Sequence, residues 1–342
     1  MVIRILLAIF LASGILLPAR NIQDTPRDCD APVPILLNGR WGFIDQNGKI
    51  VIEPQFDGAS YFSNGLAIAS VDKQSGYINQ QGEWVVKPNP LAGSFFTEGL
   101  APFVQNNKWG YIDRAGNVVI EPQFFYAGNF VNGLACAALE DMERGLIDKT
   151  GKMVLGPYHG AVSNFSEGLA AVTVGTNMGF IDRSGKMVIP AKFDTVEIFS
   201  EGLASFRNGE KRGFMDKTGR VVIPPQFNFT SEFSEGYSAV EMDNQWGYID
   251  TSGKFVIAPQ FHIAQPFSEG LAAVQIAEKW GYINMTGKIV ISPQFDLAEP
   301  FCGGLARVDV GRWIPLKFSS QRFEGKFGYI DKQGEYVWRP TD

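Results

Sequence analysis

The sequence predicts an all-β fold built from tandem repeats of about 34 residues. First, a glycine recurs in nine copies with successive spacings of 34, 34, 35, 34, 34, 34, 34 and 47 residues: Gly42, Gly76, Gly110, Gly145, Gly179, Gly213, Gly247, Gly281 and Gly328. Second, another glycine follows six residues after each of these. Third, no window shows a sustained helical period.

Each copy is predicted to contain a β-hairpin, as the copy around Gly247–Asp250 illustrates. Tyr248 and Ile249 favour a strand because aromatic and β-branched residues suit pleated sheets. The following Asp-Thr-Ser-Gly predicts a type I turn, capped by the carboxylate of the aspartate and closed by Gly253 with positive φ. Phe255–Ile257 is the return strand, and Pro259 is expected to end it because proline lacks a ladder N–H.

A third strand is predicted at Leu271–Ile276, directly after an F-S-E-G-L-A block that also recurs between copies. The repeat is therefore expected to be three-stranded. Such units can form an open superhelical stack of β-hairpins, which accepts any copy number. The alternative is a ring like that of a β-propeller, which usually has about four to eight four-stranded blades. The open stack is the preferred prediction.

The motif W-G-Y-I-D-x-x-G-K-x-V-I-x-P-Q-F followed by F-S-E-G-L-A resembles the WG, or KWG, repeat family of bacterial proteins. The resemblance covers residues 35–342. It implies tandem all-β repeats, and it implies no reaction, cofactor or catalytic residue. Both glycines persist in every copy, although the tryptophan is replaced at Ser75, Arg144, Met178, Arg212 and Phe327.

Residues 1–19 predict a signal peptide, since Arg4 is their only charge and Ile5–Leu17 is an apolar run too short for a comfortable membrane span. An uncleaved anchor is the alternative. Residues 20–34 are polar and proline-rich and are interpreted as a linker before the repeat domain at 35–342. The chain is thus expected to be exported (periplasmic, cell-surface or secreted), with no stable membrane span after cleavage.

The composition excludes some classes of function. A net charge of −6 argues against nucleic-acid binding, which needs a basic stripe to displace phosphate counterions. The two histidines, His159 and His262, have no partner at a catalytic spacing, and no zinc or phosphate-loop motif is present. The three cysteines occupy unrelated places, so free thiols are expected.

Three recurring columns, meaning positions that correspond from copy to copy, could suggest chemistry. An aspartate column with asparagine at Asn79 and Asn284 is attributed to turn capping rather than to metal binding, because one side chain per turn is too few for a calcium loop. Glutamates before a turn glycine, such as Glu167 and Glu269, are expected to form a solvated edge. The aromatic column of Trp41, Trp109, Trp246 and Trp280 could form a sugar-stacking ladder, but a role in the core of each repeat is favoured.

One segment breaks the period. Residues 307–326 contain 13 more residues than the corresponding segment of the preceding copy. Long loops in compact folds are usually functional or disordered. The candidate binding residues lie in this insert: Arg312, Trp313, Lys317, Phe318, Arg322 and Phe323.

These observations favour a non-enzymatic scaffold that presents a repeat surface to a protein partner outside the cytoplasm. A glycan-binding module of the cell envelope is the second hypothesis, and an enzyme with its site at residues 307–326 is the third. No cofactor, metal or nucleic-acid partner is predicted.

Overall fold

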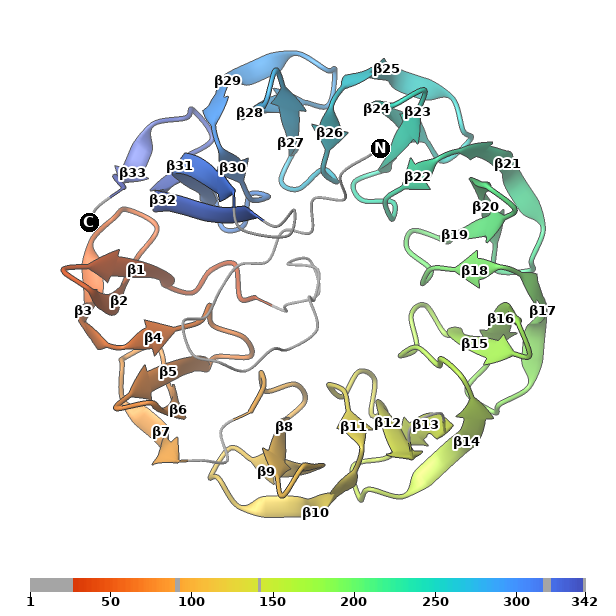
Figure 1. Ribbon diagram of the computed structural model, residues 1–342, viewed down its shortest axis with the longest axis horizontal. Helices are drawn as coiled ribbons and strands as arrows, with labels where there is room; N and C mark the ends of the chain where they lie inside the picture. The colour runs from red at the N-terminus through yellow and green to blue at the C-terminus, as the bar shows by residue number, and fades with distance from the viewer. Residues whose placement is uncertain (1–26, 90–92, 141–142, 316–320, 341–342) are drawn as a thin grey trace. The chain divides into compact units, whose positions relative to one another are not determined.

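The computed structural model describes residues 27–89, 93–140, 143–315 and 321–340, and it shows antiparallel β-sheets (Figure 1). The chain divides into two compact units, with the boundary between Phe130 in unit 1 and Val131 in unit 2. The signal-peptide prediction at residues 1–19 lies outside the described residues.

The strands of unit 1 follow one another in short hairpins. They are β1 (Val33–Leu37), β2 (Arg40–Ile44), β3 (Ile50–Phe56), β4 (Gly58–Ala59), β5 (Ala67–Val71), β6 (Gln74–Ile78), β7 (Trp84–Asn89), β8 (Leu100–Gln105), β9 (Lys108–Asp113), β10 (Val118–Phe124) and β11 (Tyr126–Ala127).

The strands of unit 2 continue the same succession. They are β12 (Ala135–Glu140), β13 (Glu143–Ile147), β14 (Met153–His159), β15 (Ala170–Val174), β16 (Asn177–Ile181), β17 (Met187–Phe193), β18 (Thr195–Val196), β19 (Leu203–Asn208), β20 (Lys211–Asp216), β21 (Val221–Phe227), β22 (Phe229–Thr230), β23 (Tyr237–Met242), β24 (Gln245–Asp250), β25 (Phe255–Phe261), β26 (Ile263–Ala264), β27 (Leu271–Ile276), β28 (Lys279–Asn284), β29 (Ile289–Phe295), β30 (Leu297–Ala298), β31 (Ala306–Pro315), β32 (Gln321–Ile330) and β33 (Tyr336–Trp338).

The complete repeat has four strands, not the three predicted. In unit 2 the sheets β18–β21, β22–β25, β26–β29 and β30–β33 each begin with a short first strand that pairs with the second, as in Ile263↔Gln275 and Ala264↔Val274. Within this unit the short strands lie on the concave side of the succession of sheets, and β21, β25 and β29 lie on the convex side (Figure 1).

The predicted open stack of three-stranded hairpins is therefore wrong, and the propeller alternative describes the structure. Four-stranded antiparallel sheets with consecutive strands as neighbours, each following the last with its short strand innermost, are the blades of a β-propeller. The described residues form nine sheets, six with four strands and three with three, and this number matches the nine copies in the sequence. The F-S-E-G block is the loop after the short strand.

The predicted hairpin turn is confirmed. Gly253 has a φ of 86° and donates its N–H to the carbonyl of Asp250 at 2.9 Å. The Asp250 carboxylate accepts the backbone N–H of Ser252 at 2.9 Å and of Lys254 at 3.1 Å. The aspartate column thus caps turns, as expected from the free exchange of aspartate and asparagine.

The first glycine of each copy is required for a different reason than the turn glycine. The outer strand β25 does not end at Pro259 as predicted but continues to Phe261 through a bulge opposite β24. A Cβ on Gly247 would lie 2.6 Å from the carbonyl oxygen of Ile257 and 2.7 Å from the nitrogen of Pro259. Since real Cβ atoms essentially never come that close, only glycine lets the bulged strand lie on the one beside it.

Successive sheets in unit 2 pack through aromatic residues. The ring of Tyr248 lies 4.8 Å from that of Phe267, and its hydroxyl donates to the carbonyl of Gln265 at 2.8 Å. Both rings are almost fully buried. Because each sheet supplies one half of the contact with its neighbour, the core consists of clusters between adjacent sheets, as in other repeat proteins.

The loops of the F-S-E-G block add polar contacts between copies. The Glu235 carboxylate accepts the backbone N–H of Gly270 at 2.9 Å, 35 residues later, and the Ser234 hydroxyl donates to the carbonyl of Phe267 at 2.8 Å. The same contacts join Glu167 and Glu201 to the glycine of the next loop. Glu167, Glu201 and Glu235 are exposed, as the predicted solvated edge requires, but they also have a role that was not predicted, since their carboxylates hold one repeat to the next.

Candidate binding surface

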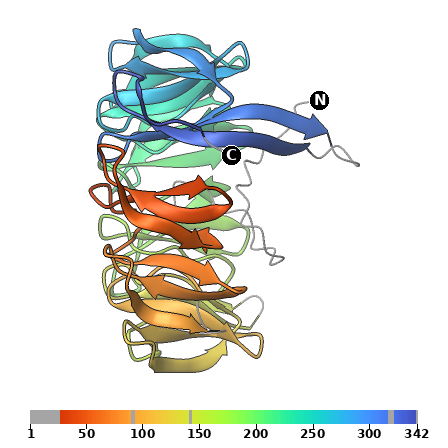
Figure 2. The same cartoon turned by 90° about the vertical axis from the view of Figure 1, so that its left-hand side faces the viewer.

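The insert at residues 307–326 is an extension of a repeat hairpin. In the preceding copy Ile276 and Lys279 close the hairpin, and the corresponding pair is Val310 and Lys326. The ladder then continues for five more pairs, from Gly311↔Gly325 to Pro315↔Gln321. The extension projects beyond the neighbouring strands of unit 2 (Figure 2).

The six candidate residues of the insert differ in how far the structure describes them. Arg312 is exposed and stands opposite Glu324, and Phe323 is half-buried. Trp313 and Arg322 lie in β31 and β32 as ladder residues. Lys317 and Phe318 lie outside the described residues.

The extension begins at a pair of glycines. Gly311 and Gly325 face each other, and a Cβ on Gly311 would overlap the backbone of Glu324 and Gly325. The Gly311 N–H donates to the Asp296 carboxylate at 2.8 Å, which also accepts the Lys279 ammonium at 2.6 Å. The two strands therefore leave the sheet in close contact and are fixed to β28 and β30 by one carboxylate.

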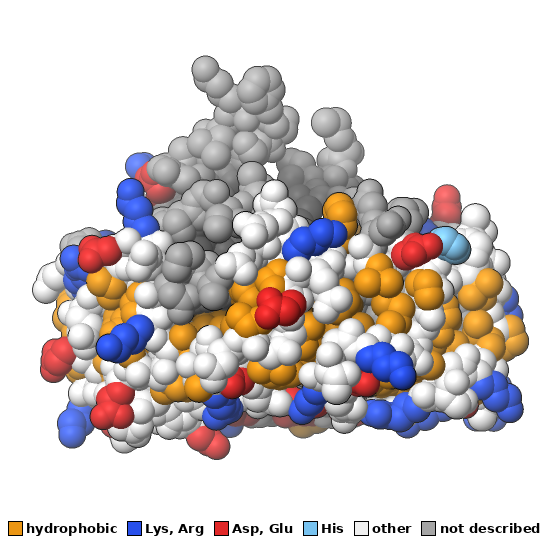
Figure 3. All heavy atoms as spheres, turned by 90° about the horizontal axis from the view of Figure 1, so that it is seen from below, with side chains coloured by type: hydrophobic (Ala, Val, Ile, Leu, Met, Phe, Trp, Pro, Cys, Tyr) orange, Lys and Arg blue, Asp and Glu red, His pale blue; other side chains and the backbone are white. Residues whose placement is uncertain are grey.

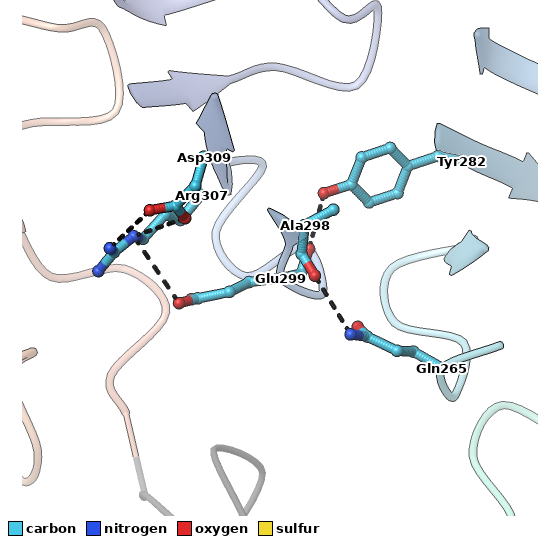
Figure 4. A network of polar contacts seen from close by, with 6 residues as sticks. All are labelled: Gln265, Tyr282, Ala298, Glu299, Arg307 and Asp309. Atoms are coloured by element: carbon cyan, nitrogen blue, oxygen red, sulfur yellow. Dashed lines mark hydrogen bonds and ion pairs between the residues drawn. The ribbon is translucent and has the colours of Figure 1, made fainter. Parts of the chain in front are cut away.

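A cluster of charged groups lies at the base of the extension (Figure 4). The guanidinium of Arg307 donates to both carboxylate oxygens of Asp309, at 3.2 and 3.0 Å, and lies 4.0 Å from a carboxylate oxygen of Glu299. Its Cζ lies 4.1 Å from the ring centre of Phe327. Burial raises the pKa of Asp309 and the charge of Glu299 adds to this, whereas Arg307 acts in the opposite direction.

The same network reaches the neighbouring sheet. The Tyr282 hydroxyl donates to the carbonyl of Glu299 at 2.8 Å, and the Gln265 side-chain amide donates to the carbonyl of Ala298 at 3.2 Å (Figure 4). In the copies before, the position of Arg307 holds Ala273 and Ala239. An arginine in place of alanine, paired with the buried Asp309 where the preceding copy has Gln275, gives this hairpin a charged base that the repeat itself does not require.

The tryptophan column does not form an exposed ladder. Trp280 is buried in the cluster between its sheet and the next, and Trp41 and Trp246 are half-buried against similar clusters. Trp109 is half-buried and packs against Tyr126. The favoured prediction, that these rings serve the core of each repeat, describes most of the column.

The remaining candidates are dispersed. His159 and His262 are exposed on separate sheets of unit 2. Within the described ranges no three His, Cys, Asp or Glu side chains come together as a metal site would need.

Cys29 and Cys302 are each disulfide-bonded, so the expectation of free thiols is wrong for them, whereas Cys136 is free and buried. In the part of the chain that is described, no helix has the length and apolarity needed to cross a bilayer.

Hydrophobic side chains also reach the surface, as the face drawn in Figure 3 shows. Among the described residues, many exposed hydrophobic side chains are valines of the outer strands at one repeat position, such as Val188, Val256 and Val290, which are 37–40% exposed. Since these recur from copy to copy, they reflect strand propensity. Three large aromatic residues among those described are also exposed, Phe125, Tyr126 and Phe229, and the sequence prediction missed them.

Comparison with solved structures finds similar folds at low sequence identity. Hsv2 of Kluyveromyces lactis is 9% identical with a TM-score of 0.42, covering 69% of this chain and 96% of its own. Dihydro-heme d1 dehydrogenase NirN is 13% identical with a TM-score of 0.47 (95% and 75% covered). The WD40 β-propeller domain of Doa1 is 10% identical with a TM-score of 0.31 (72% and 89% covered). Likeness at this level carries no information about activity or partner.

Comparison with curated protein sequences finds no match. The profile of the WG containing repeat matches eight consecutive segments, residues 41–74, 76–109, 109–141, 145–175, 178–211, 213–246, 246–280 and 280–311. These segments coincide with the glycine period and make up most of the sequence. The chain therefore belongs to the family of WG-containing repeat proteins.

Proposed function

We propose that this repeat protein is a non-enzymatic scaffold that binds a protein partner outside the cytoplasm, and that the β31–β32 extension makes the main contact. The observation that carries the proposal is the continued ladder from Gly311↔Gly325 to Pro315↔Gln321. The preceding copy closes its hairpin with only two residues, Ala277-Glu278, so the extension adds nothing that the sheet needs.

The contacts that hold the base of the extension support a binding role. The ion pair of Arg307 and Asp309 and the Asp296–Gly311 hydrogen bond hold its base. A contact surface that is ordered before binding loses less conformational entropy on association. Arginine and aromatic residues, which the extension contains, are enriched in protein interfaces.

The location outside the cytoplasm rests on the apolar run Ile5–Leu17 and the single charge Arg4 before it. A precursor fused to a periplasmic reporter should be processed near Ala19. Intact Met1 on a soluble protein recovered from the cytoplasm would contradict the proposed location without affecting the proposed binding.

The binding proposal is tested by shortening the hairpin. Replacing Gly311–Gly325 with Ala-Glu restores the connection found between Ile276 and Lys279. We expect the variant to unfold at the same denaturant concentration as the parent. In a pull-down from an envelope fraction, it should no longer capture the protein that the parent captures. A large drop in stability would instead make the extension a structural cap, and undiminished capture would place the contact elsewhere.

A further inference from the structure

An exposed cluster of aromatic side chains lies in unit 1, around β9 and β11. We call it the aromatic patch and define it as Val104, Trp109, Phe125 and Tyr126. Val104 and Trp109 are direct cross-strand partners on β8 and β9, and the Tyr126 ring centre lies 6.4 Å from that of Trp109. Val104, Phe125 and Tyr126 are 40%, 54% and 36% exposed.

The repeat does not require an aromatic residue at position 125. Three of the corresponding residues in other copies are Asp57, Asp194 and Asp296. The carboxylates of Asp57 and Asp194 accept the N–H of a hairpin-turn residue, and that of Asp296 accepts the N–H of Gly311 at the start of the extension. The other described copies have Gly160, Asn228 and His262 at this position. Asp296 also pairs with Lys279, 17 residues before it. In the third copy a phenylalanine takes the place of the carboxylate, and the Lys108 ammonium, also 17 residues before it, lies 4.6 Å over the ring centre.

Tyr126 is likewise larger and more aromatic than most residues at the same position of the other copies. Its counterparts include Gly58, Thr195 and Ile263 at the starts of the short strands β4, β18 and β26. Most copies thus have a small or aliphatic residue at this position. The sixth copy has Phe229, which is also exposed, so the third copy differs in exposing two aromatic residues that are consecutive in the chain, Phe125 and Tyr126. Adjacent exposed rings that the fold does not need mark a binding surface, because exposed apolar patches on soluble proteins are usually small unless they bind something.

The rim of the patch consists of amides. Gln105, Asn106 and Asn107 are all exposed, and the two asparagines form the β8–β9 turn with positive φ. An amide side chain both donates and accepts hydrogen bonds, as a sugar hydroxyl does. The flat apolar faces of Phe, Tyr and Trp match the C–H face of a pyranose ring, and Tyr and Trp also carry a polar group at one edge.

We infer that the aromatic patch binds a neutral glycan. Patch and rim contain no carboxylate, and the ammonium of Lys108 is placed over Phe125, so neither supplies the paired charges that select an ionic ligand. Aromatic faces beside amides provide stacking and hydrogen bonding without charge. This glycan site differs from the tryptophan ladder considered from the sequence, because only Trp109 of that column takes part.

The test replaces the patch by residues that the repeat itself uses. The double variant Phe125→Asp with Tyr126→Thr recreates the local sequence of Asp194 and Thr195 and allows Lys108 to form the ion pair seen between Lys279 and Asp296. Binding of the full chain to neutral hexasaccharides of glucose and N-acetylglucosamine is measured by calorimetry. We expect at least one to bind, and the double variant to bind it at least tenfold more weakly with an unchanged unfolding midpoint.

A matched control lies in unit 2. Phe229 is 52% exposed and occupies the repeat position of Tyr126, so Phe229→Thr removes a similar ring elsewhere. The control variant and the shortened hairpin should both retain glycan binding, which separates this inference from the proposed protein contact. Three results would overturn the inference. The parent could bind no neutral oligosaccharide, or Phe229→Thr could weaken glycan binding as much as the double variant does. The double variant could also keep glycan binding and lose protein capture instead.

Discussion

Substitution of one turn glycine tests how the repeats are joined. The change Gly253→Val acts on two features at once. Gly253 has a φ of 86°, where a β-branched residue is strained by about 1–3 kcal/mol. Its added Cβ would also lie 3.1 Å from Cγ1 and Cγ2 of Ile223, in the preceding sheet. Crowding a well-packed core costs about 1–3 kcal/mol more.

Gly236 separates the two costs. Its φ is 83°, but a Cβ there would meet no atom within 4 Å. Gly236→Val should therefore carry the backbone strain alone, and Gly253→Val should be more destabilising by about 1–3 kcal/mol. Both values would come from urea unfolding followed by circular dichroism, because the change in midpoint at constant slope reports stability.

A double-mutant cycle with Ile223→Ala completes the experiment. Ile223 is 1% exposed, so its truncation alone destabilises the protein, but it also removes the atoms that the valine side chain introduced at position 253 would meet. The two changes should therefore cost less together than the sum of the single changes. Equal costs at Gly253 and Gly236 with no coupling to Ile223 would refute the packing of this turn on the preceding sheet.

Two further predictions concern titratable groups. The hydrogen-bonded ion pair with Lys217 lowers the pKa of Glu167 in the folded state, so stability from this carboxylate is present above its ordinary pKa and is lost as the pH falls. Acid unfolding of Glu167→Gln should show a weaker pH dependence between about pH 5 and pH 3 than that of the parent, and parallel curves would contradict the contact. Burial raises the pKa of Cys136 to about 11, so iodoacetamide at about pH 8 should label it only after unfolding, as mass spectrometry would show; rapid labelling of the native protein would contradict its burial.

The sequence predicted the parts of the fold that arise from neighbours in the chain. The turn at Asp250 and Gly253 follows from a carboxylate that caps nearby N–H groups and a glycine that accepts positive φ. The short strand Ile263–Ala264 was missed because two residues leave no alternation to detect. The role of Glu235 was missed because its partner, the N–H of Gly270, lies 35 residues away.

The candidate site was predicted in part for the same reason. A break in the period located the extension, but its pairing was not evident because Gly311, Gly325 and Pro315 are unfavourable in a regular strand. The signal at Phe125 was present in the sequence. Alignment of the copies sets it against three aspartates, Asp57, Asp194 and Asp296, and against Leu91, Gly160, Asn228 and His262, so it is the only aromatic carbocycle in its column.

An internal repeat allows structure and function to be separated within one chain. Residues that recur, such as Gly247 and Glu235, are explained by contacts within a sheet or between adjacent sheets. Some exposed residues differ from those at the same repeat position in other copies, and contacts within the fold do not explain them. The extension and the aromatic patch are both of this kind. Because each repeat contacts mainly its neighbours, a change at either place should disturb stability only locally. Restoring the repeat's own residues at Phe125 or at Gly311–Gly325 should therefore remove a binding function while leaving the other and the fold in place.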